Sequence, residues 1–304
     1  MPDFEFFLQQ LSNGLTRGSI YALIALGYTM VYGVMKLINF AHGELFALGA
    51  YLGYTLLVVF GLGGSLGPPL AIGLSIIMVV GLVSLAGYLL ERVAYRPLRS
   101  SDRLAAVVSA LGASIFLQNA IMLQWGAQYR AFGADLLPNV VFHIGGFNLP
   151  LVRVLVFVAA VAVMAALHVF VHRTRLGLAI RAAAIDQGAA KLMGVDVQKV
   201  IILVFIIGPA LGGLAGLLVG VYYGQINFNM GQLYGLKAFT AAIVGGIGNI
   251  TGAMVGGLLL GLLEALGEGY ISVIWKDAIT FLVLILILVF RPTGLLKERV
   301  AEKL

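Results

Sequence analysis

Long apolar stretches separated by short polar segments run through the whole chain. Nine of these stretches are predicted to cross a membrane, because a spanning helix needs about 20 mostly apolar residues. The predicted spans are 15–35, 44–60, 69–90, 104–124, 151–171, 200–222, 233–248, 252–268 and 277–290. The stretches 44–60, 233–248 and 252–268 are short for a span, so they are predicted to be tilted or broken helices. The predicted fold class is therefore an all-α polytopic membrane protein, with eight or ten spans if one break is re-entrant.

One polar interruption of this pattern occurs twice, 188 positions apart. The segment from Ile38 to Ala50 returns from Ile226 to Ala238, with Ile, Asn, Phe, Gly, Leu, Leu and Ala matching and no gap. Matching polar breaks in two apolar halves are typical of a transport site near a repeat interface. Chance similarity between two apolar segments is the alternative.

The number of spans between the two copies gives the repeat a direction. Five predicted spans separate the copies, so the copies should face opposite sides of the membrane. We therefore expect one transmembrane domain over 1–304, made of inverted halves at about 1–171 and 200–304. The segment 172–199 joins these halves.

Composition agrees with a lipid environment. Apolar residues make up 61% of the 304 residues and charged residues 11%, whereas a soluble domain carries about 25% charged residues. The net charge is +6, which by itself could suggest nucleic acid. The basic residues, however, gather in the segments 91–103 and 172–199 and in the tail after Phe290, which is the pattern of loops on the cytoplasmic side. The chain has no cysteine, which excludes disulfides and cysteine metal sites.

Polar residues inside predicted spans are candidates for a substrate path, since such residues are energetically costly in lipid. Asn39 precedes a helix and can either cap it or lie on the path, and Asn227 is its counterpart. His42 and Glu44 lie in the first break, where a local buried hydrogen-bonded pair is the alternative to a functional role. No histidine shares a ligand-like spacing with carboxylates, so no metal site and no catalytic constellation is proposed.

Two further candidates lie in the second half. Lys237 can pair with Glu44, attract a substrate carboxylate or extend towards the membrane surface, and the last is favoured. Glu264 lies four residues before Glu268, near the outer end of the eighth span. Polarity of an outer mouth is favoured there over a proton relay.

The segment 172–199 is longer than a connection requires. Alanine, leucine and methionine dominate 178–193, which predicts one short helix outside the bilayer. Gly194 is placed to end this helix. We expect the segment to offer a docking surface.

The pattern Arg-Ala-x-Ala-x-Asp-x-x-x-Ala-x-x-Met-Gly-Val-Asp at 181–196 resembles the coupling-helix region of ABC-importer permeases. Arg181 stands where that family usually has glutamate. The segments 37–44, 91–97 and 239–252 resemble the branched-chain amino-acid permease family, most closely its H-subunit type. For coupling to an ATPase, the resemblance implies seven residues: Arg181, Ala183, Asp186, Ala189, Ala190, Met193 and Gly194.

The resemblance further implies a permease subunit of a bacterial inner-membrane importer that moves leucine, isoleucine or valine by alternating access. Its partners would be a homologous second permease of the M type, two cytoplasmic ABC ATPases and a periplasmic amino-acid-binding protein. ATP would be used by the ATPases, and this chain itself would bind no cofactor and catalyse no reaction. Two alternatives remain open: a self-contained proton-coupled transporter with Glu44 or Glu264 as carrier, and an ABC permease for other amino acids, amides or urea.

Overall fold

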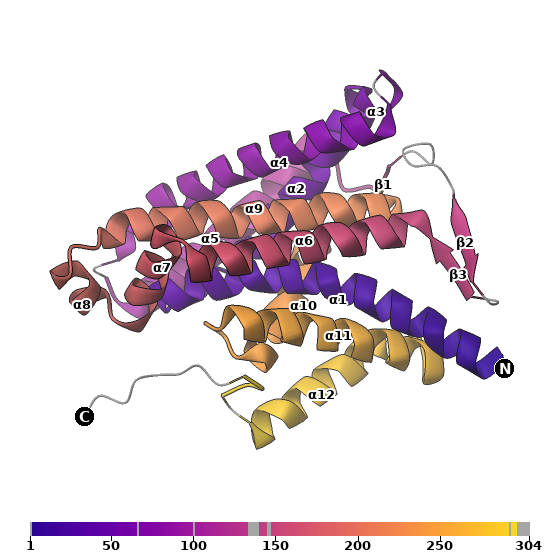
Figure 1. Cartoon of the computed structure of the whole chain (residues 1–304). Coiled ribbons are helices and arrows are strands. Elements are labelled where there is room, and N and C mark those ends of the chain that lie inside the picture. Colours follow the sequence, from indigo (N-terminus) through magenta and orange to yellow (C-terminus); the bar gives the residue numbers. More distant parts are fainter. Residues whose placement is uncertain are drawn as a thin grey trace.

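A bundle of long helices forms the molecule (Figure 1). The computed structural model describes residues 2–65, 67–99, 101–132, 140–144, 147–291 and 293–296. The basic residues Lys297, Arg299 and Lys303 lie outside this part of the chain. The helices are α1 (Pro2–Met35), α2 (His42–Tyr54), α3 (Leu62–Ser65), α4 (Pro68–Leu90), α5 (Arg103–Trp125), α6 (Leu151–Arg173), α7 (Arg175–Ile185), α8 (Gln187–Leu192), α9 (Val197–Tyr223), α10 (Met230–Gly245), α11 (Ile250–Tyr270) and α12 (Lys276–Phe290).

The two ends of the bundle differ in structure. Two short antiparallel pairs lie at one end, here called the strand end: β1 (Arg130–Ala131) pairs with β4 (Gln225–Ile226), and β2 (Val141–Ile144) with β3 (Phe147–Pro150). Helices α7 and α8 lie at the opposite end, here called the α8 end (Figure 1). The π-helical segment Thr55–Val59 extends α2, and the π-helical segment Glu91–Tyr95 and the 3-10 helix Arg96–Leu98 extend α4.

Seven helices among the described residues are long and apolar enough to cross a membrane. Helices α10 and α12, with 16 and 15 residues, are shorter. The all-α polytopic fold is confirmed, and the count of nine spans is approximate. The expectation that 252–268 is short is wrong, since α11 has 21 residues.

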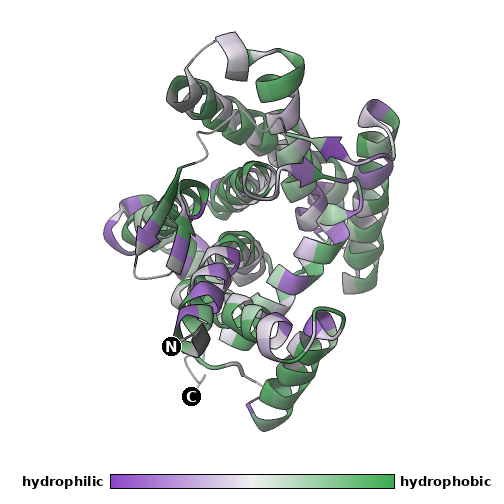
Figure 2. Ribbon diagram, turned by 90° about the vertical axis from the view of Figure 1, so that its right-hand side faces the viewer, coloured by the Kyte–Doolittle hydropathy of each residue, from purple (hydrophilic) through white to green (hydrophobic). Residues whose placement is uncertain are grey.

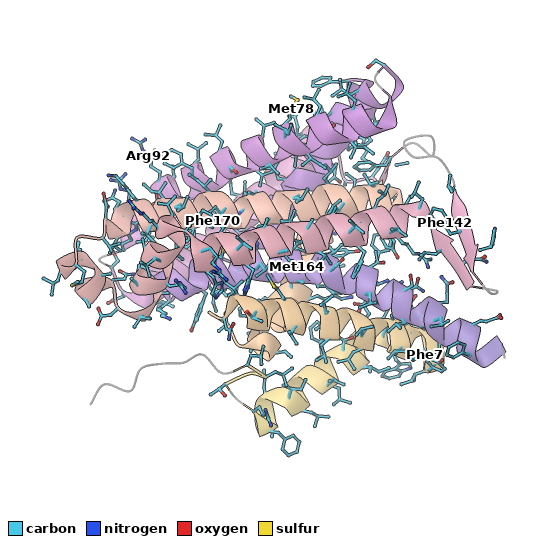
Figure 3. The ribbon with its side chains drawn as sticks, viewed as in Figure 1. Phe7, Met78, Arg92, Phe142, Met164 and Phe170 are labelled. Atoms are coloured by element: carbon cyan, nitrogen blue, oxygen red, sulfur yellow. The ribbon has the colours of Figure 1, made fainter. Side chains whose placement is uncertain are left out.

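The outer faces of the bundle are apolar, as a lipid environment requires. Met78 points away from the bundle (Figure 3), and Phe116 and Leu123 are 71% and 82% exposed. Seen along the helices, the ribbons are mostly hydrophobic around the bundle (Figure 2). A helix satisfies its own backbone hydrogen bonds, which is why it suits this surrounding.

Close helix packing holds the centre. Helix α1 packs on α9, α10 and α11, while α9 also packs on α2 and α4. Glycines make the contacts close: Gly208 of α9 faces Gly27 of α1, and a Cβ built on Gly14 of α1 would lie 2.9 Å from the Leu262 Cα of α11. Small residues that let helix backbones approach are typical of membrane bundles.

Helices α2 and α10 run in opposite directions. Helix α2 starts beside Gly212 of α9 and follows α9, which runs towards the strand end. Helix α10 instead follows α1 towards the α8 end, with Tyr234 beside Tyr21 and Phe239 beside Tyr28. Opposite directions are what an inverted pair requires; the boundaries of the two halves stay a prediction.

Candidate substrate pathway

The two breaks in the helices share one backbone geometry. His42 N donates to the Asn39 carbonyl at 3.1 Å, and Met230 N donates to the Asn227 carbonyl at 3.2 Å. The residues before the helices, Ala41 and Asn229, have φ/ψ values of −74°/−5° and −84°/−6°. The sequence repeat is therefore also a repeat of local structure, and both helices begin at corresponding residues.

The starts of the two helices touch each other. A Cβ built on Gly231 would lie 2.8 Å from the Gly43 carbonyl oxygen, and one on Gly235 would lie 2.9 Å from the Gly43 Cα. Gly43 and Gly231 are corresponding residues of the repeat, so the approximate twofold axis passes between them. Two positive helix ends thus converge at one place in the bundle.

A cavity of about 400 Å³ opens beside this contact, between α1, α2, α5 and α10. Glu44 and its counterpart Gln232 both line it. The remaining wall is mostly apolar and includes Tyr28, Ile38, Phe40, Gly43, Leu111, Ser114, Ile115, Gln118, Gly231, Gly235, Leu236 and Phe239. Its size lies within the range of small-molecule sites.

Glu44 is the buried carboxylate of this cavity. Its side chain belongs to the first turn of α2 and the residue is 3% exposed. Its Oε2 atom is buried without a hydrogen-bond partner and faces the first turn of α10, where a Cβ on Gly231 would lie 2.5 Å away. The first turns of both helices favour a negative charge here.

Asn39 and His42 are packing residues rather than cavity residues. The Tyr95 hydroxyl donates to Asn39 Oδ1 at 2.9 Å, and no side chain caps α2, so the capping interpretation of Asn39 is wrong. His42 Nε2 lies 3.2 Å from the Ile24 carbonyl oxygen, and its ring stands edge-on to Tyr28 at 4.6 Å between centroids. His42 Nδ1 and Glu44 Oε2 both have no partner, so the alternative of a local hydrogen-bonded pair between these residues is not formed.

Asn227 lies at a different cavity. This second cavity, of about 230 Å³, is lined by Tyr129, Val219, Tyr223, Gln225, Ile226, Asn227, Met230 and Tyr234, next to β4 at the strand end. The Asn227 Oδ1 atom is buried without a partner. The two corresponding asparagines therefore have different surroundings.

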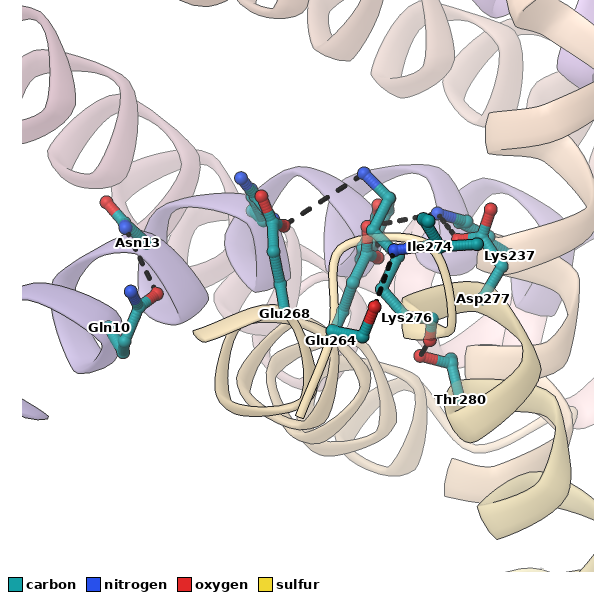
Figure 4. A network of polar contacts seen from close by, with 12 residues as sticks. Gln10, Asn13, Lys237, Glu264, Glu268, Ile274, Lys276, Asp277 and Thr280 are labelled. Carbon is teal, nitrogen blue, oxygen red and sulfur yellow. Dashed lines mark hydrogen bonds and ion pairs between the residues drawn. The ribbon is translucent and has the colours of Figure 1, made fainter. Parts of the chain in front are cut away.

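Lys237 and Glu264 form a buried polar network with their neighbours (Figure 4). Lys237 Nζ lies 3.0 Å from Glu264 Oε1 and 2.7 Å from Asp277 Oδ1, and Lys237 is 8% exposed. The Tyr21 hydroxyl donates to Glu264 Oε2 at 2.7 Å. The prediction that Lys237 extends to the membrane surface is therefore wrong, because its ammonium group is paired inside the bundle. The prediction that Glu264 makes an outer mouth polar is wrong for the same reason.

The predicted single helix over 178–193 is in fact two helices, α7 and α8. Asp186 separates them, because its Oδ1 accepts from Gly188 N at 2.7 Å and Ala189 N at 3.0 Å and so starts a new helix. Gly194 has a φ of +83° and ends α8, as predicted.

The seven expected coupling residues divide by burial. Ala183 and Ala190 are buried and pack against the bundle, and the Arg181 Nε atom is buried without a partner. Met193 is 84% exposed, Ala189 and Gly194 are also exposed, and Asp186 is half-buried. The predicted set does not include Ile185 and Leu192, which are 73% and 90% exposed. Exposed apolar side chains in helices outside the spans are a signal of an interaction surface.

Polar contacts fix this segment to the bundle. Gln187 Nε2 donates to the Val34 carbonyl at 2.6 Å, which ties α8 to the end of α1. The backbone N–H of Lys199, together with its ammonium group, holds the pKa of the Asp196 carboxyl below its ordinary value. Asp196 caps α9, because its Oδ1 accepts from the Lys199 backbone N–H at 3.1 Å.

Comparison with known proteins identifies the family. The family described as "Branched-chain amino acid transport system / permease component" matches residues 10–288. The chain belongs to this family. It is 46% identical over 306 residues to the high-affinity branched-chain amino acid transport system permease protein BraD of Pseudomonas aeruginosa, covering 100% of both chains. It is 43% identical to the permease protein LivH of Escherichia coli K12, covering 99% of this chain and 98% of LivH.

More distant relatives of this permease extend beyond amino-acid systems. The ribose import permease protein RbsC of Escherichia coli K12 is 28% identical over 248 residues, covering 80% of this chain and 71% of RbsC. No solved structure gives a significant match. Among the described residues, no group of three or more histidine, aspartate or glutamate side chains is arranged to hold a metal ion.

Proposed function

We propose that the chain is the permease subunit of an ABC importer that carries branched-chain amino acids across the bacterial inner membrane. Family membership and the transport of branched-chain amino acids by the systems of BraD and LivH support this proposal. The observation in the structure that carries it is the meeting of α2 and α10, two broken helices of opposite direction, at one cavity. Alternating access would open this cavity first to one side and then to the other.

The distribution of basic residues supports an orientation. Arg92 lies at the α8 end of the bundle (Figure 3), and Arg99 lines a surface cavity with Gln187 and Lys191 of α8. Basic residues favour the cytoplasmic side. We therefore place the α8 end in the cytoplasm and the strand end in the periplasm, where the amino-acid-binding protein would dock.

The α8 end would receive the ATPases. Ile185, Leu192 and Met193 form the apolar docking surface, because all three are exposed apolar side chains between the last residue of α7 and the residue after α8. Two cytoplasmic ATPase subunits would hydrolyse ATP and move this segment. A homologous second permease would complete the membrane part, and this chain would bind neither ATP nor a cofactor.

Reconstitution in liposomes tests the function. The chain with its second permease, ATPases and binding protein should take up radiolabelled leucine only with ATP. Leu192→Glu and Met193→Glu should lower uptake about tenfold or more by charging the docking surface, while the permease remains inserted. Leu178→Glu, on α7 and 59% exposed, is the matched control outside this surface. Uptake by the chain alone, driven by a pH gradient, would instead establish the proton-coupled alternative.

A further inference from the structure

An unpaired carboxylate in an apolar cavity needs a partner. Among the described residues that line the 400 Å³ cavity, Glu44 is the one that carries a formal charge. Its Oε2 atom has no hydrogen-bond partner, and no ion pair to Glu44 occurs among the described residues. Leaving a charge in this condition is energetically unfavourable. The position is therefore suited to a cation that enters the cavity.

The other residues that line the cavity indicate the shape of the cation that it would bind. Ile38, Leu111, Ile115 and Leu236 provide an aliphatic wall, and Ser114, Gln118 and Gln232 add neutral polar groups. Gln118 Nε2 donates to Asn229 Oδ1 at 3.1 Å, which holds its amide in one orientation. The wall fits a small molecule with a branched aliphatic part and a single positive group.

The helix starts add a complementary feature. Neither α2, with 13 residues, nor α10, with 16, is capped by a side chain at its start. Uncapped N–H groups at a helix start attract carboxylates. A molecule with both an ammonium and a carboxylate group thus finds both partners beside one cavity.

We propose that Glu44 binds the ammonium group of the amino-acid substrate in this cavity, with the aliphatic side chain against the apolar wall. The inference rests on the proposed function. An ammonium-to-carboxylate contact is a charge-assisted hydrogen bond, which is stronger than a neutral one. A compound without an ammonium group would leave Glu44 unpaired, so Glu44 would select for amino acids inside the membrane, after the binding protein has made its own selection.

The corresponding position in the second half sharpens the proposal. Gln232 lies 188 positions after Glu44 and lines the same cavity, but it is neutral. A pair of carboxylates would repel each other here. One carboxylate and one amide across the approximate axis instead provide one ammonium site, with a defined orientation for the substrate.

Three variants in the complete reconstituted importer test the assignment, with leucine uptake measured per assembled complex. Glu44→Gln keeps the shape and removes the charge, so uptake should fall about tenfold or more. Glu44→Asp keeps the charge in a shorter side chain and should retain more uptake than Glu44→Gln. Tyr51→Phe is the matched control, since Tyr51 lies on the same helix and its buried hydroxyl also has no partner, but it lies outside the cavity lining. It should transport like the wild type.

The outcomes separate this inference from the proposed function. A shape requirement would give the opposite ranking, with Glu44→Gln close to the wild type and Glu44→Asp impaired, and would overturn the inference. Loss of assembly in Glu44→Gln would also overturn it, because removing an unpaired buried charge should not destabilise the fold. Absence of leucine uptake by the wild-type complex would instead refute the proposed function.

Discussion

The two helix breaks have the same backbone and different chemistry. Asn39 and Asn227 make equivalent turns, and α2 and α10 begin 188 positions apart. Yet Asn39 bonds to Tyr95 inside the bundle, while Asn227 lies at a cavity next to the strand end. Glu44 is matched by the neutral Gln232. The two copies thus share the backbone at which a helix starts and meets the other helix, whereas their side chains differ.

Helices α2 and α10 are also held in place by different kinds of interaction. Helix α2 is held by close packing, with Gly49 against the backbone of Gly213. The counterpart of Gly49 is Lys237, which pairs with Glu264 and Asp277. Packing depends on the volume of one residue, whereas an ion-pair network depends on the presence of every partner. Substitutions should therefore affect the two helices in different ways.

The largest expected effect is at the ion pair of α10. Lys237→Met leaves Glu264 charged and buried, which should lower the free energy of unfolding by about 3–5 kcal/mol. The double variant Lys237→Met/Glu264→Gln removes the unpaired charge and should recover part of that loss. Thermal unfolding in detergent measures both. If the single variant unfolds at the wild-type temperature, the network does not stabilise α10.

A smaller effect is expected where the two helices touch. Gly43→Val and Gly231→Val each place a side chain against the backbone of the other helix start, which should cost about 3 kcal/mol. Gly81→Val in α4 is the control, because nothing lies within 4 Å of its Cβ position. Yields of folded protein after detergent extraction should rank Gly81→Val above both others. Equal yields would mean that the contact is not essential.

The smallest effect should separate the two asparagines. Asn39→Leu leaves the buried Tyr95 hydroxyl without its acceptor, so it should cost about 1–2 kcal/mol. Asn227→Leu removes a side chain whose Oδ1 has no partner, and the free energy of unfolding should change by less than about 0.5 kcal/mol. Melting temperatures of the two variants provide the comparison. Equal shifts would show that the breaks are equivalent in energy as well as in backbone.

Much of the fold follows from local rules, and the site does not. The length of the apolar stretches predicts most spans, because a chain in lipid must satisfy its own backbone hydrogen bonds and a helix does so. The same rule fails at 252–268, a stretch predicted to be short, because α11 continues to Tyr270 and has 21 residues. Its glycines Gly252 and Gly256 are buried in the close contact of α11 with α10. Spacing along one helix cannot show which neighbour fills the space beside a glycine.

The sequence by itself determined the membrane class, the family, the repeat and its direction, because these depend on composition and on matching positions along one chain. Only the tertiary structure decided which polar groups are paired. Lys237 and Glu264 are 27 residues apart and Asn39 and Tyr95 are 56 apart, and their contacts depend on how four helices pack. The physical reason is that a charge in the membrane must find a partner, and that partner is set by neighbours in space. Among the described residues, Glu44 has no ion-pair partner, and it lines the cavity between α2 and α10.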